Sequence, residues 1–600
     1  MSDQATGSGP ADTTDRLEIQ IGAAGEARYA AAIALAQDER WVARLFDRDT
    51  TLWTENADIG ELISDRLGWL SVPATFEARI PALEGFGEGV REAGFTAVVI
   101  AGMGGSSLIA RVLIDAFAGI PDWQVIRVLD STDPAAVSGT FDDLDPLATL
   151  VVVSTKSGTT IETRCFAATA WARAEEAIRN HHAPAWETPG EMIAAITNPG
   201  RSLEALDHHD ELREVFLDPT DVGGRFSALT YVGLVPASLV GIDLDPFLAS
   251  AASMLERCRV VDPAANPGLS LGLALGSLAQ GGRDKLTFII DREIATLGAW
   301  LEQLIAESTG KHGVGIIPID REPLGAVVAC PDDRVFVRIA LTDSSGPEPA
   351  ADGAPAEARL AELQAAGHPV IRISITDPID LGGELFRWEV ATAFAGALLG
   401  INPFDEPNVA ESKENTRRVL ATSEEEHPLQ AIEPLATQDG LIVHGDSLLR
   451  LTAGDGTLTG ELRRHLARIL PGNYLAVTAY LAPTPEREAA IGRIRALLRD
   501  ATHCATTGAF GPQYLHSTGQ LHKGGAPIGW FLQLTADHPD DREIPDHAYS
   551  YGQLIDAQAI GDFEALEAHE LPVLRVHLGE RPDERLATLE QALAAALRKD

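Results

Sequence analysis

Basic side chains are few in this chain of 600 residues, where 47 lysines and arginines face 88 aspartates and glutamates. The resulting net charge of −41 repels phosphate backbones and anionic lipid, so we expect no nucleic-acid partner and no membrane partner. Cysteine is also scarce, and the four residues lie far apart with no paired spacing: Cys165, Cys258, Cys330 and Cys504. This pattern argues against a disulfide scaffold or a zinc cluster, and it suits a reducing cytosol.

Long apolar runs are missing as well. Three charge-free stretches reach 17 to 20 residues, at 93–110, 226–242 and 263–282, and glycines interrupt each of them. They fit strand–loop segments or packed helices better than membrane spans. The first twenty residues have no apolar core behind a basic lead, so we expect no signal peptide. With 45% apolar and 22% charged residues, the chain reads as a cytoplasmic globular enzyme of at least two domains.

Lysine is the rarest of the charged residues, with six against 41 arginines. The chain therefore uses arginine wherever a general surface cation is sufficient. Where lysine persists, a compact ammonium or a shiftable pKa is the expected reason, because the two side chains differ in geometry and acidity. Three of the six lysines, Lys156, Lys311 and Lys413, fall inside the motifs described below, and Lys523 lies two residues after another.

The hydrophobic pattern divides the chain into segments. Residues 1–80 show amphipathic helical spacing after a polar start, which predicts an N-terminal helical segment. From about residue 95, β-rich runs alternate with helical stretches, which is typical of parallel, doubly wound sheets. We expect two three-layer α/β/α domains with flanking helices, the first at 81–250 and the second begun by 251–430 and completed by 431–600. The expected strands include Thr96–Ile100, Gln124–Leu129, Thr149–Val153, Met192–Thr197, Val215–Leu217, Lys285–Ile290, Arg334–Leu341, Val370–Ile375, Tyr474–Leu481, Trp530–Leu534 and Val573–Val576.

A glycine loop follows the first of these strands. The run Gly102-Met103-Gly104-Gly105-Ser106 leaves a buried strand and opens a helix, an arrangement that brings a phosphate to backbone N–H groups. It partly matches a dinucleotide fingerprint, with Asp130 as the ribose acceptor, although Ser107 stands at the third glycine position. A nicotinamide dehydrogenase is therefore one alternative.

A second loop is rich in hydroxyl groups. After the strand at 149–153, the seven residues 154–160 carry five hydroxyls and one lysine. Hydroxyl-rich loops also cap helices without any ligand, but this density at the carboxyl edge of a parallel sheet favours a phosphate monoester. The ligand is therefore expected to be a sugar phosphate. The candidate binding residues are Gly104, Gly105, Ser106, Ser154, Lys156, Ser157, Thr159 and Thr160.

Together the two loops resemble the sugar isomerase (SIS) domain of the glucose-6-phosphate isomerase family. Three further stretches match that family: Gly223–Ser227, Gln303–Lys311, and Asn402–Asp405 with Val409 and Lys413. The matches span roughly residues 90–415. The resemblance implies two SIS domains and no metal or organic cofactor. It also implies reversible conversion of glucose 6-phosphate to fructose 6-phosphate through an enediol, a step of glycolysis and gluconeogenesis.

The catalytic roles come partly from spacing and partly from the resemblance. Gln303 and Glu307 are four residues apart on a predicted helix, so both could meet one substrate. A partly buried glutamate suits a general base, whereas an exposed glutamate at a helix end is the alternative. The resemblance implies that Glu307 moves the proton between C2 and C1. It further implies that Arg225 stabilises the enediolate and that Lys413 lies near the ring oxygen.

A histidine is expected to open the sugar ring, because it transfers protons near neutral pH. Tyr514–Leu521 resembles the family's histidine segment and implicates His516, with His312 and His522 as alternatives. In ordinary members this segment precedes the Asn402–Asp405 motif, whereas here it follows by about a hundred residues. This order resembles the isomerase half of fused transaldolase–glucose-6-phosphate isomerase proteins, although no transaldolase half is visible.

The resemblance leaves assembly and substrate range open. In ordinary dimeric members the histidine comes from the neighbouring subunit, so the relocated segment leaves both a homodimer and a monomer possible. A non-catalytic sugar-phosphate regulator and an isomerase that also accepts mannose 6-phosphate are the alternative functions, because one epimeric hydroxyl changes binding by only a few kcal/mol.

Overall fold

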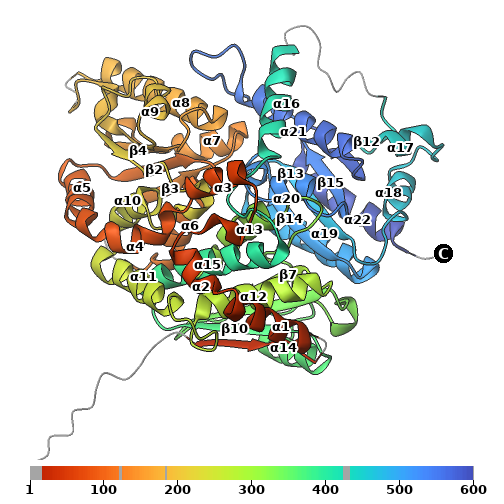
Figure 1. Ribbon diagram of the computed structural model, residues 1–600. Helices are drawn as coiled ribbons and strands as arrows, with labels where there is room; N and C mark the ends of the chain where they lie inside the picture. The colour runs from red at the N-terminus through yellow and green to blue at the C-terminus, as the bar shows by residue number, and fades with distance from the viewer. Residues whose placement is uncertain (1–15, 24, 121–124, 183–184, 423–432, 599–600) are drawn as a thin grey trace, which may run out of the picture.

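The computed structural model describes residues 16–598 apart from 24, 121–124, 183–184 and 423–432. Its strands form three sheets, each mostly parallel and covered by helices, so the predicted α/β class is confirmed (Figure 1). We expected residues 431–600 to complete the second domain, but their strands do not extend its sheet. These residues form a sheet of their own, because their strands pair with one another rather than with the strands of 285–375.

The first sheet is entirely parallel, in the order β3-β2-β4-β5-β6. Its central strands are apolar on both faces, as parallel strands covered by helices on both sides require. All five strands lie within a residue or two of their predicted positions. The strands are β2 (Ala97–Gly102), β3 (Val125–Leu129), β4 (Thr149–Ser154), β5 (Ile193–Thr197) and β6 (Glu214–Leu217), and the helices are α6 (Gly105–Ala116), α7 (Pro134–Phe141), α8 (Ile161–Asn180) and α9 (Arg201–Glu204).

The second sheet has the order β1-β10-β9-β7-β8, with only its edge strand β1 (Arg16–Gln20) antiparallel. The helix α15 (Leu381–Leu399) is buried along most of its length and packs on α11, α12 and α13. The other strands are β7 (Lys285–Ile290), β8 (Ile317–Ile319), β9 (Arg334–Leu341) and β10 (Val370–Ile375). The helices of this region are α11 (Leu244–Cys258), α12 (Pro267–Gln280), α13 (Leu297–Thr309) and α14 (Ala356–Ala365). On either side of them in the chain, α10 (Tyr231–Val240) packs on α6 of the first region, and α16 (Val409–Thr422) packs on α21 (Tyr551–Ala568) of the third.

The third sheet has the order β11-β12-β16-β15-β13-β14. Its last four strands in this order, from β16 to the edge strand β14, are parallel. One face packs an apolar core against α18, α19 and α22, while the other is partly polar and lies under α21. The strands are β11 (Ala436–Gln438), β12 (Leu441–Gly445), β13 (Tyr474–Tyr480), β14 (Ala505–Phe510), β15 (Gly529–Thr535) and β16 (Val573–His577). The helices are α17 (Ser447–Leu451), α18 (Leu458–Leu466), α19 (Pro485–Thr502), α20 (Gly519–Gly524), α21 (Tyr551–Ala568) and α22 (Pro582–Ala596).

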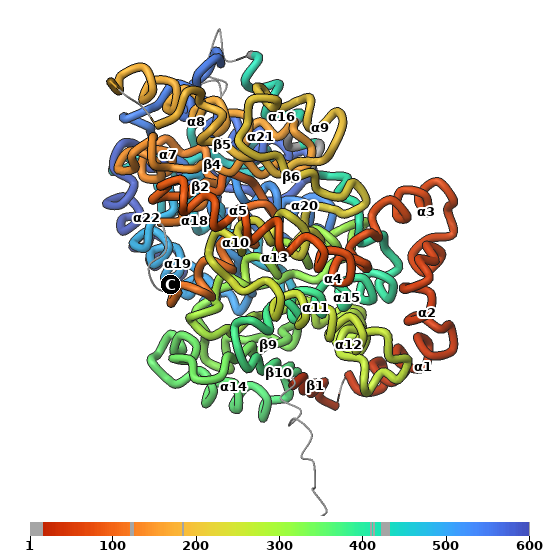
Figure 2. The backbone as a smooth tube through the Cα atoms, turned by 90° about the vertical axis from the view of Figure 1, so that its left-hand side faces the viewer, coloured from red at the N-terminus to blue at the C-terminus, as the bar shows by residue number. Residues whose placement is uncertain are grey.

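The N-terminal region is helical, as predicted, except for β1, which joins the second sheet beside β10 (Figure 2). The polar start at 1–15 lies outside the described residues. The helices of this region are α1 (Glu26–Asp38), α2 (Trp41–Phe46), α3 (Ala57–Ser64), α4 (Val72–Thr75) and α5 (Ile80–Glu92). Within the described part of the chain, no helix combines the length and apolarity that a membrane crossing needs.

Helix α13 connects the three regions. It packs against α6 of the first region, α15 of the second and α20 of the third. A further apolar cluster joins the first sheet to residues at the start of α21, including Tyr551 and Leu554. The place where the three regions meet is therefore the carboxyl edge of the first sheet, next to α13.

Candidate active site

A pocket of about 190 Å³ lies at this meeting point. Its walls come from the glycine loop after β2, the hydroxyl loop after β4, the turn at Gly224 and Arg225, helix α13, and the segment that carries His516. Open α/β sheets bind ligands at this carboxyl edge. The lining residues are Met103, Gly104, Gly105, Ser106, Ser154, Thr155, Lys156, Ser157, Thr160, Thr163, Gly224, Arg225, Gln303, Glu307, Glu406 and His516.

Two glycines allow these walls to approach one another. Gly104 has φ of +57°, and a Cβ there would lie 2.8 Å from Gln303 Nε2 and 2.9 Å from the carbonyl oxygen of His516. A Cβ on Gly105 would lie 2.3 Å from the carbonyl oxygen of Gly224. A side chain at either position would therefore push away the neighbouring segment. The glycine loop is needed for close backbone approach as well as for its N–H groups.

The hydroxyl loop provides hydrogen-bond donors beside the N-terminus of α6. Ser154 and Thr155 are buried, and their hydroxyl oxygens have no hydrogen-bond partner among the described residues. Lys156 also lines the pocket, where its ammonium forms an ion pair with Asp218. Thr159 is exposed and donates to Ser157 at 3.1 Å, so of the predicted phosphate donors it is the one outside the pocket lining.

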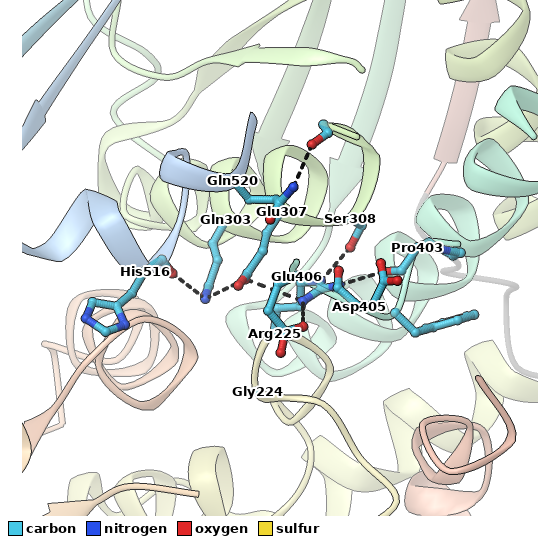
Figure 3. Close-up of polar contacts among 12 residues, drawn as sticks. Gly224, Arg225, Gln303, Glu307, Ser308, Pro403, Asp405, Glu406, His516 and Gln520 are labelled. Carbon is cyan, nitrogen blue, oxygen red and sulfur yellow. Dashed lines mark hydrogen bonds and ion pairs between the residues drawn. The ribbon is translucent and has the colours of Figure 1, made fainter. Parts of the chain in front are cut away.

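Glu307 and Gln303 lie on one face of α13, as their spacing predicts (Figure 3). Gln303 Nε2 donates to Glu307 Oε2 at 3.2 Å and to the carbonyl oxygen of His516 at 2.8 Å. Burial raises the pKa of the Glu307 carboxyl above its ordinary value, even though the nearby guanidinium of Arg225 opposes this shift. A carboxylate with a raised pKa is suited to proton transfer near neutral pH.

Arg225 is held from all sides and is 3% exposed. Its Nε donates to Ser308 Oγ at 2.7 Å, and its Nη2 donates to the carbonyl oxygens of Pro403 and Asp405 at 2.8 and 2.9 Å (Figure 3). Its Nη1 lies 3.0 Å from Glu406 Oε2 and 3.6 Å from Glu307 Oε2. The predicted Gly223–Ser227 turn and the Asn402–Asp405 motif thus meet at one guanidinium beside the buried carboxylate.

His516 reaches the pocket from the C-terminal region, in the turn before α20. Its Nε2 lies 3.0 Å from Glu162 Oε1, and Gln558 Nε2 of α21 donates to the same oxygen at 2.7 Å. Thr132 in turn donates to Gln558 Oε1 at 2.7 Å. This buried chain of contacts orients the imidazole, since a carboxylate that accepts from a ring nitrogen fixes the ring.

The other predicted histidines lie elsewhere. His312 is exposed, and neither it nor His522 lines the pocket. Burial, aided by the nearby charge of Lys523, lowers the pKa of His522 to about 3, so this imidazole is neutral at physiological pH. His516 is therefore the candidate that the geometry favours.

The two lysines near the Asn402–Asp405 motif differ. Lys413 lies on α16, but its side chain is outside what the structure describes. Lys311 is buried, and its Nζ donates to the Asn402 carbonyl oxygen at 2.6 Å and to Asp405 Oδ1 at 2.7 Å. Burial lowers the pKa of Lys311 to about 8. Lys311 thus secures the same turn that Arg225 contacts.

Several residues in or beside the pocket were not predicted as site residues. Glu162 lies two residues after the hydroxyl loop, and its place in the first turn of α8 was the available signal. Glu406 follows the Asn402–Asp405 motif by one residue. Gln558 is 396 residues from Glu162 and belongs to no motif, so only the folded chain brings the two together.

A parallel sheet with a hydroxyl-rich loop and a buried carboxylate at its carboxyl edge is typical of α/β enzymes of the sugar-phosphate isomerase class. Residues 75–316 match the family model described as phosphoglucose isomerase. The chain is 31% identical over 400 residues to the glucose-6-phosphate isomerase of Rubrobacter xylanophilus, a match that covers 60% of this chain and 90% of that protein. The chain belongs to the glucose-6-phosphate isomerase family.

A second curated relative and two solved structures are also similar to this chain, the structures in fold. The glucose-6-phosphate isomerase of Heliobacterium modesticaldum is 28% identical over 411 residues, covering 62% of this chain and 90% of that protein. A hypothetical protein of Thermus thermophilus shares the fold with a TM-score of 0.53 and 23% identity, over 68% of this chain and all of that one. A glucose-6-phosphate isomerase from Chlamydia trachomatis gives 0.50 and 20%, over 66% of this chain and 86% of that one.

Proposed function

We propose that this protein interconverts glucose 6-phosphate and fructose 6-phosphate, the step shared by glycolysis and gluconeogenesis, in the cytoplasm. The observation that carries the proposal is a buried carboxylate, Glu307, beside a fully engaged guanidinium, Arg225, at the end of a loop of hydroxyl donors. Family membership supports the same reaction.

The phosphate belongs at the hydroxyl loop. The N–H groups at the start of α6 and the hydroxyls of Ser154, Thr155, Ser157 and Thr160 surround one side of the pocket. Several short donors at a helix N-terminus suit a doubly charged ester. Lys156 adds positive charge that Asp218 partly balances. The sugar then extends toward Glu307, on the opposite wall.

The isomerisation needs one base and one stabiliser of negative charge. The Glu307 carboxylate takes the proton from C2. The electrons of that C–H bond form the C1=C2 bond, while the π electrons of the C1 carbonyl move to O1 and give the enediolate. After a proton passes from O2 to O1, Glu307 returns its proton to C1, and the aldose has become the ketose. Arg225 lies next to this carboxylate and stabilises the enediolate oxygen electrostatically.

Ring opening falls to His516, since its imidazole lines the pocket and its orientation is held by Glu162. A proton leaves the C1 hydroxyl and another reaches the ring oxygen, which breaks the C1–O5 bond. By its position in the family motif, Lys413 is the proposed helper near the ring oxygen. Acid and base groups acting together give a bell-shaped pH dependence of kcat/KM.

A coupled assay tests the activity directly. Fructose 6-phosphate is supplied, and glucose 6-phosphate formation is followed through a dehydrogenase that does not act on the ketose. Turnover supports the proposal, whereas tight binding of the sugar phosphate without turnover would indicate a regulator. The same assay with mannose 6-phosphate defines the substrate range.

We further propose that one chain forms a complete active site. The wall that carries His516 contacts Gln303 and Gly104 of the same chain, so no neighbouring subunit is needed to supply the histidine. Specific activity is expected to stay constant on dilution through any dimer dissociation seen by light scattering. Loss of activity in step with dissociation would contradict the proposal.

A further inference from the structure

A second cavity, of about 740 Å³, lies in the C-terminal region at the carboxyl ends of β15 and β16, beside β12 and the N-terminal half of α21. It shares no lining residue with the candidate active site. Figure 1 shows β12, β15 and α21 together in the blue part of the chain. The position matches the edge at which α/β sheets bind small molecules.

The register of the sheet explains why polar side chains gather there. His444 of β12 is paired with Arg575 of β16, and Thr535 of β15 is paired with His577. Paired residues lie on the same face of a sheet, and this face is turned toward α21. The residues between them, such as Val576, belong to the apolar core on the opposite face.

Arg575 provides an incompletely paired positive charge in the lining of this cavity. It is 1% exposed, its Nε donates to Gln533 Oε1 at 2.6 Å, and its Nη2 donates to the Ala559 carbonyl oxygen at 2.7 Å. Within the described residues Nη1 has no hydrogen-bond partner, and both acceptors of this guanidinium are uncharged. Burial lowers the pKa of Arg575 to about 10, so it still carries its charge at neutral pH. A buried donor of this kind calls for an anionic oxygen.

His444 adds a second unused group next to Arg575. Its Nδ1 is buried and has no hydrogen-bond partner among the described residues. Burial, together with the charge of Arg575 and His577, lowers the pKa of His444 to about 4. The imidazole is therefore neutral at pH 7 and can bind a ligand oxygen without repelling the guanidinium.

The rim of the cavity is acidic, but its carboxylates have partners. Asp537 lies 3.1 Å from His577 Nε2, and Asp556 lies 3.5 Å from His538 Nε2. Asp541 accepts from the hydroxyl of Ser550 and, at 2.7 Å, from the backbone N–H of Gly552. The exposed Glu543 adds a further negative charge. Such a rim repels a singly charged anion less than a doubly charged phosphate, and it accepts hydrogen bonds from hydroxyl groups.

We propose that this cavity is a second ligand site that takes a small sugar acid, a molecule with one carboxylate and several hydroxyl groups. The carboxylate pairs with Arg575 and His444, and the hydroxyls donate to the rim carboxylates Asp537 and Asp556. The site is separate from the isomerase pocket and does not depend on the function proposed for it. A metal ion fits less well, since within the described residues no three His, Cys, Asp or Glu side chains converge as ligands.

Isothermal titration with gluconate tests this proposal. One gluconate per chain is expected to bind, and saturating fructose 6-phosphate in the cell should leave the affinity unchanged, because the two pockets are distinct. Glucose, which has the hydroxyls but no carboxylate, should bind at least about tenfold more weakly. Absence of gluconate binding, competition by fructose 6-phosphate, or equal binding of glucose would each overturn the proposal.

Variants locate the site. Arg575→Met is expected to weaken gluconate binding at least about tenfold, and Asp537→Asn, at the exposed rim, to weaken it by a few fold. Arg495→Met is the matched control, since Arg495 is a buried arginine of the same region that contacts Asp320 and Thr506 instead of this cavity. If Arg575→Met does not fold, His444→Ala takes its place. Unchanged binding in the cavity variants would place gluconate elsewhere and refute the site.

Discussion

The first and third sheets are both largely parallel, yet they use their faces differently. In the first sheet, alternate residues of the central strands enter two separate apolar clusters, so both faces are hydrophobic. In the third sheet, one face is apolar, whereas the other carries Tyr480, Gln533 and Arg575 beneath α21. Chemistry at the first sheet is therefore confined to its carboxyl edge, while polar groups of the third sheet extend into its interior.

This contrast explains how the third sheet supports a pocket at the edge of the first. Asp562 of α21 accepts a hydrogen bond from Tyr514 OH at 2.6 Å and forms an ion pair with Lys523 at 2.8 Å. These two partners of Asp562 flank His516 in the sequence. Gln558 of the same helix holds Glu162 against His516. The buried polar face therefore fixes a segment that the first sheet needs but does not contain.

The largest effect is expected from a substitution at the carboxyl edge of the first sheet. Glu307→Gln keeps the shape of the side chain and an oxygen that accepts from Gln303, but it removes the base. We therefore expect kcat to fall roughly 10²- to 10⁴-fold, while KM and the melting temperature change little. The coupled assay measures this loss. Glu302→Gln is the control, because Glu302 is a buried glutamate of α13 outside the pocket. Similar losses in both variants would argue against a special role for Glu307.

The next effect tests the polar interior of the third sheet. Asp562→Asn leaves the buried ammonium of Lys523 without its carboxylate, so the free energy of unfolding should fall by roughly 3–5 kcal/mol. Urea denaturation followed by circular dichroism measures it. Asp583→Asn, which breaks an exposed pair with Arg487, should cost less than about 1 kcal/mol. If both variants lose the same free energy of unfolding, the buried ion pair on the polar face stabilises the fold no more than a surface ion pair does.

A third variant tests the link between the two sheets. Glu162→Gln weakens the contact that orients the His516 imidazole, but Glu162 itself does not contact substrate in the proposed mechanism. We therefore expect kcat/KM to fall by roughly 10- to 100-fold. Glu162→Asp keeps the charge and should recover part of the loss. If the Glu162→Asp and Glu162→Gln variants lose the same fraction of kcat/KM, the carboxylate charge is not what positions His516.

The last test concerns the pH dependence of the free energy of unfolding, through a buried carboxyl group of α13. Burial raises the pKa of Glu302 to about 8, so between about pH 4.5 and 8 the folded protein holds a proton that the unfolded chain releases. The contribution of this group to stability therefore falls as pH rises through that window, by at most about 5 kcal/mol. Glu302→Gln removes the dependence, so its advantage over the wild type in melting temperature should be larger at pH 8.5 than at pH 5. A constant difference would contradict the raised pKa.

Much of this architecture follows from sequence patterns, and the exceptions have physical reasons. The apolar runs of β2, β4 and β9 are unmistakable because both their faces are buried. The edge strands β1 and β8 were missed, since the first alternates with charged residues and the second has three residues including a proline. Strand β14 was missed because threonine and glycine interrupt its apolar pattern.

The residues of the candidate active site also divide into those that sequence patterns predict and those that they do not. Glu307 and Gln303 were predictable together because helical spacing places them on one face. The motifs around Arg225 and His516 were recognisable from local residues, although nothing local shows that they share a pocket. Glu162 and Gln558 meet across 396 residues, and no periodicity records a contact at that separation.

Because Gly104 has no side chain, a distant segment of the chain can pack directly against its backbone. The carbonyl oxygen of His516 occupies the space that a Cβ would need, at 2.9 Å. A chimera that takes its N-terminal half from one relative and its histidine segment from another would therefore have to exchange both pieces together. Residue 104 and the turn at 513–516 would therefore have to come from the same parent, although more than 400 positions separate them in the chain.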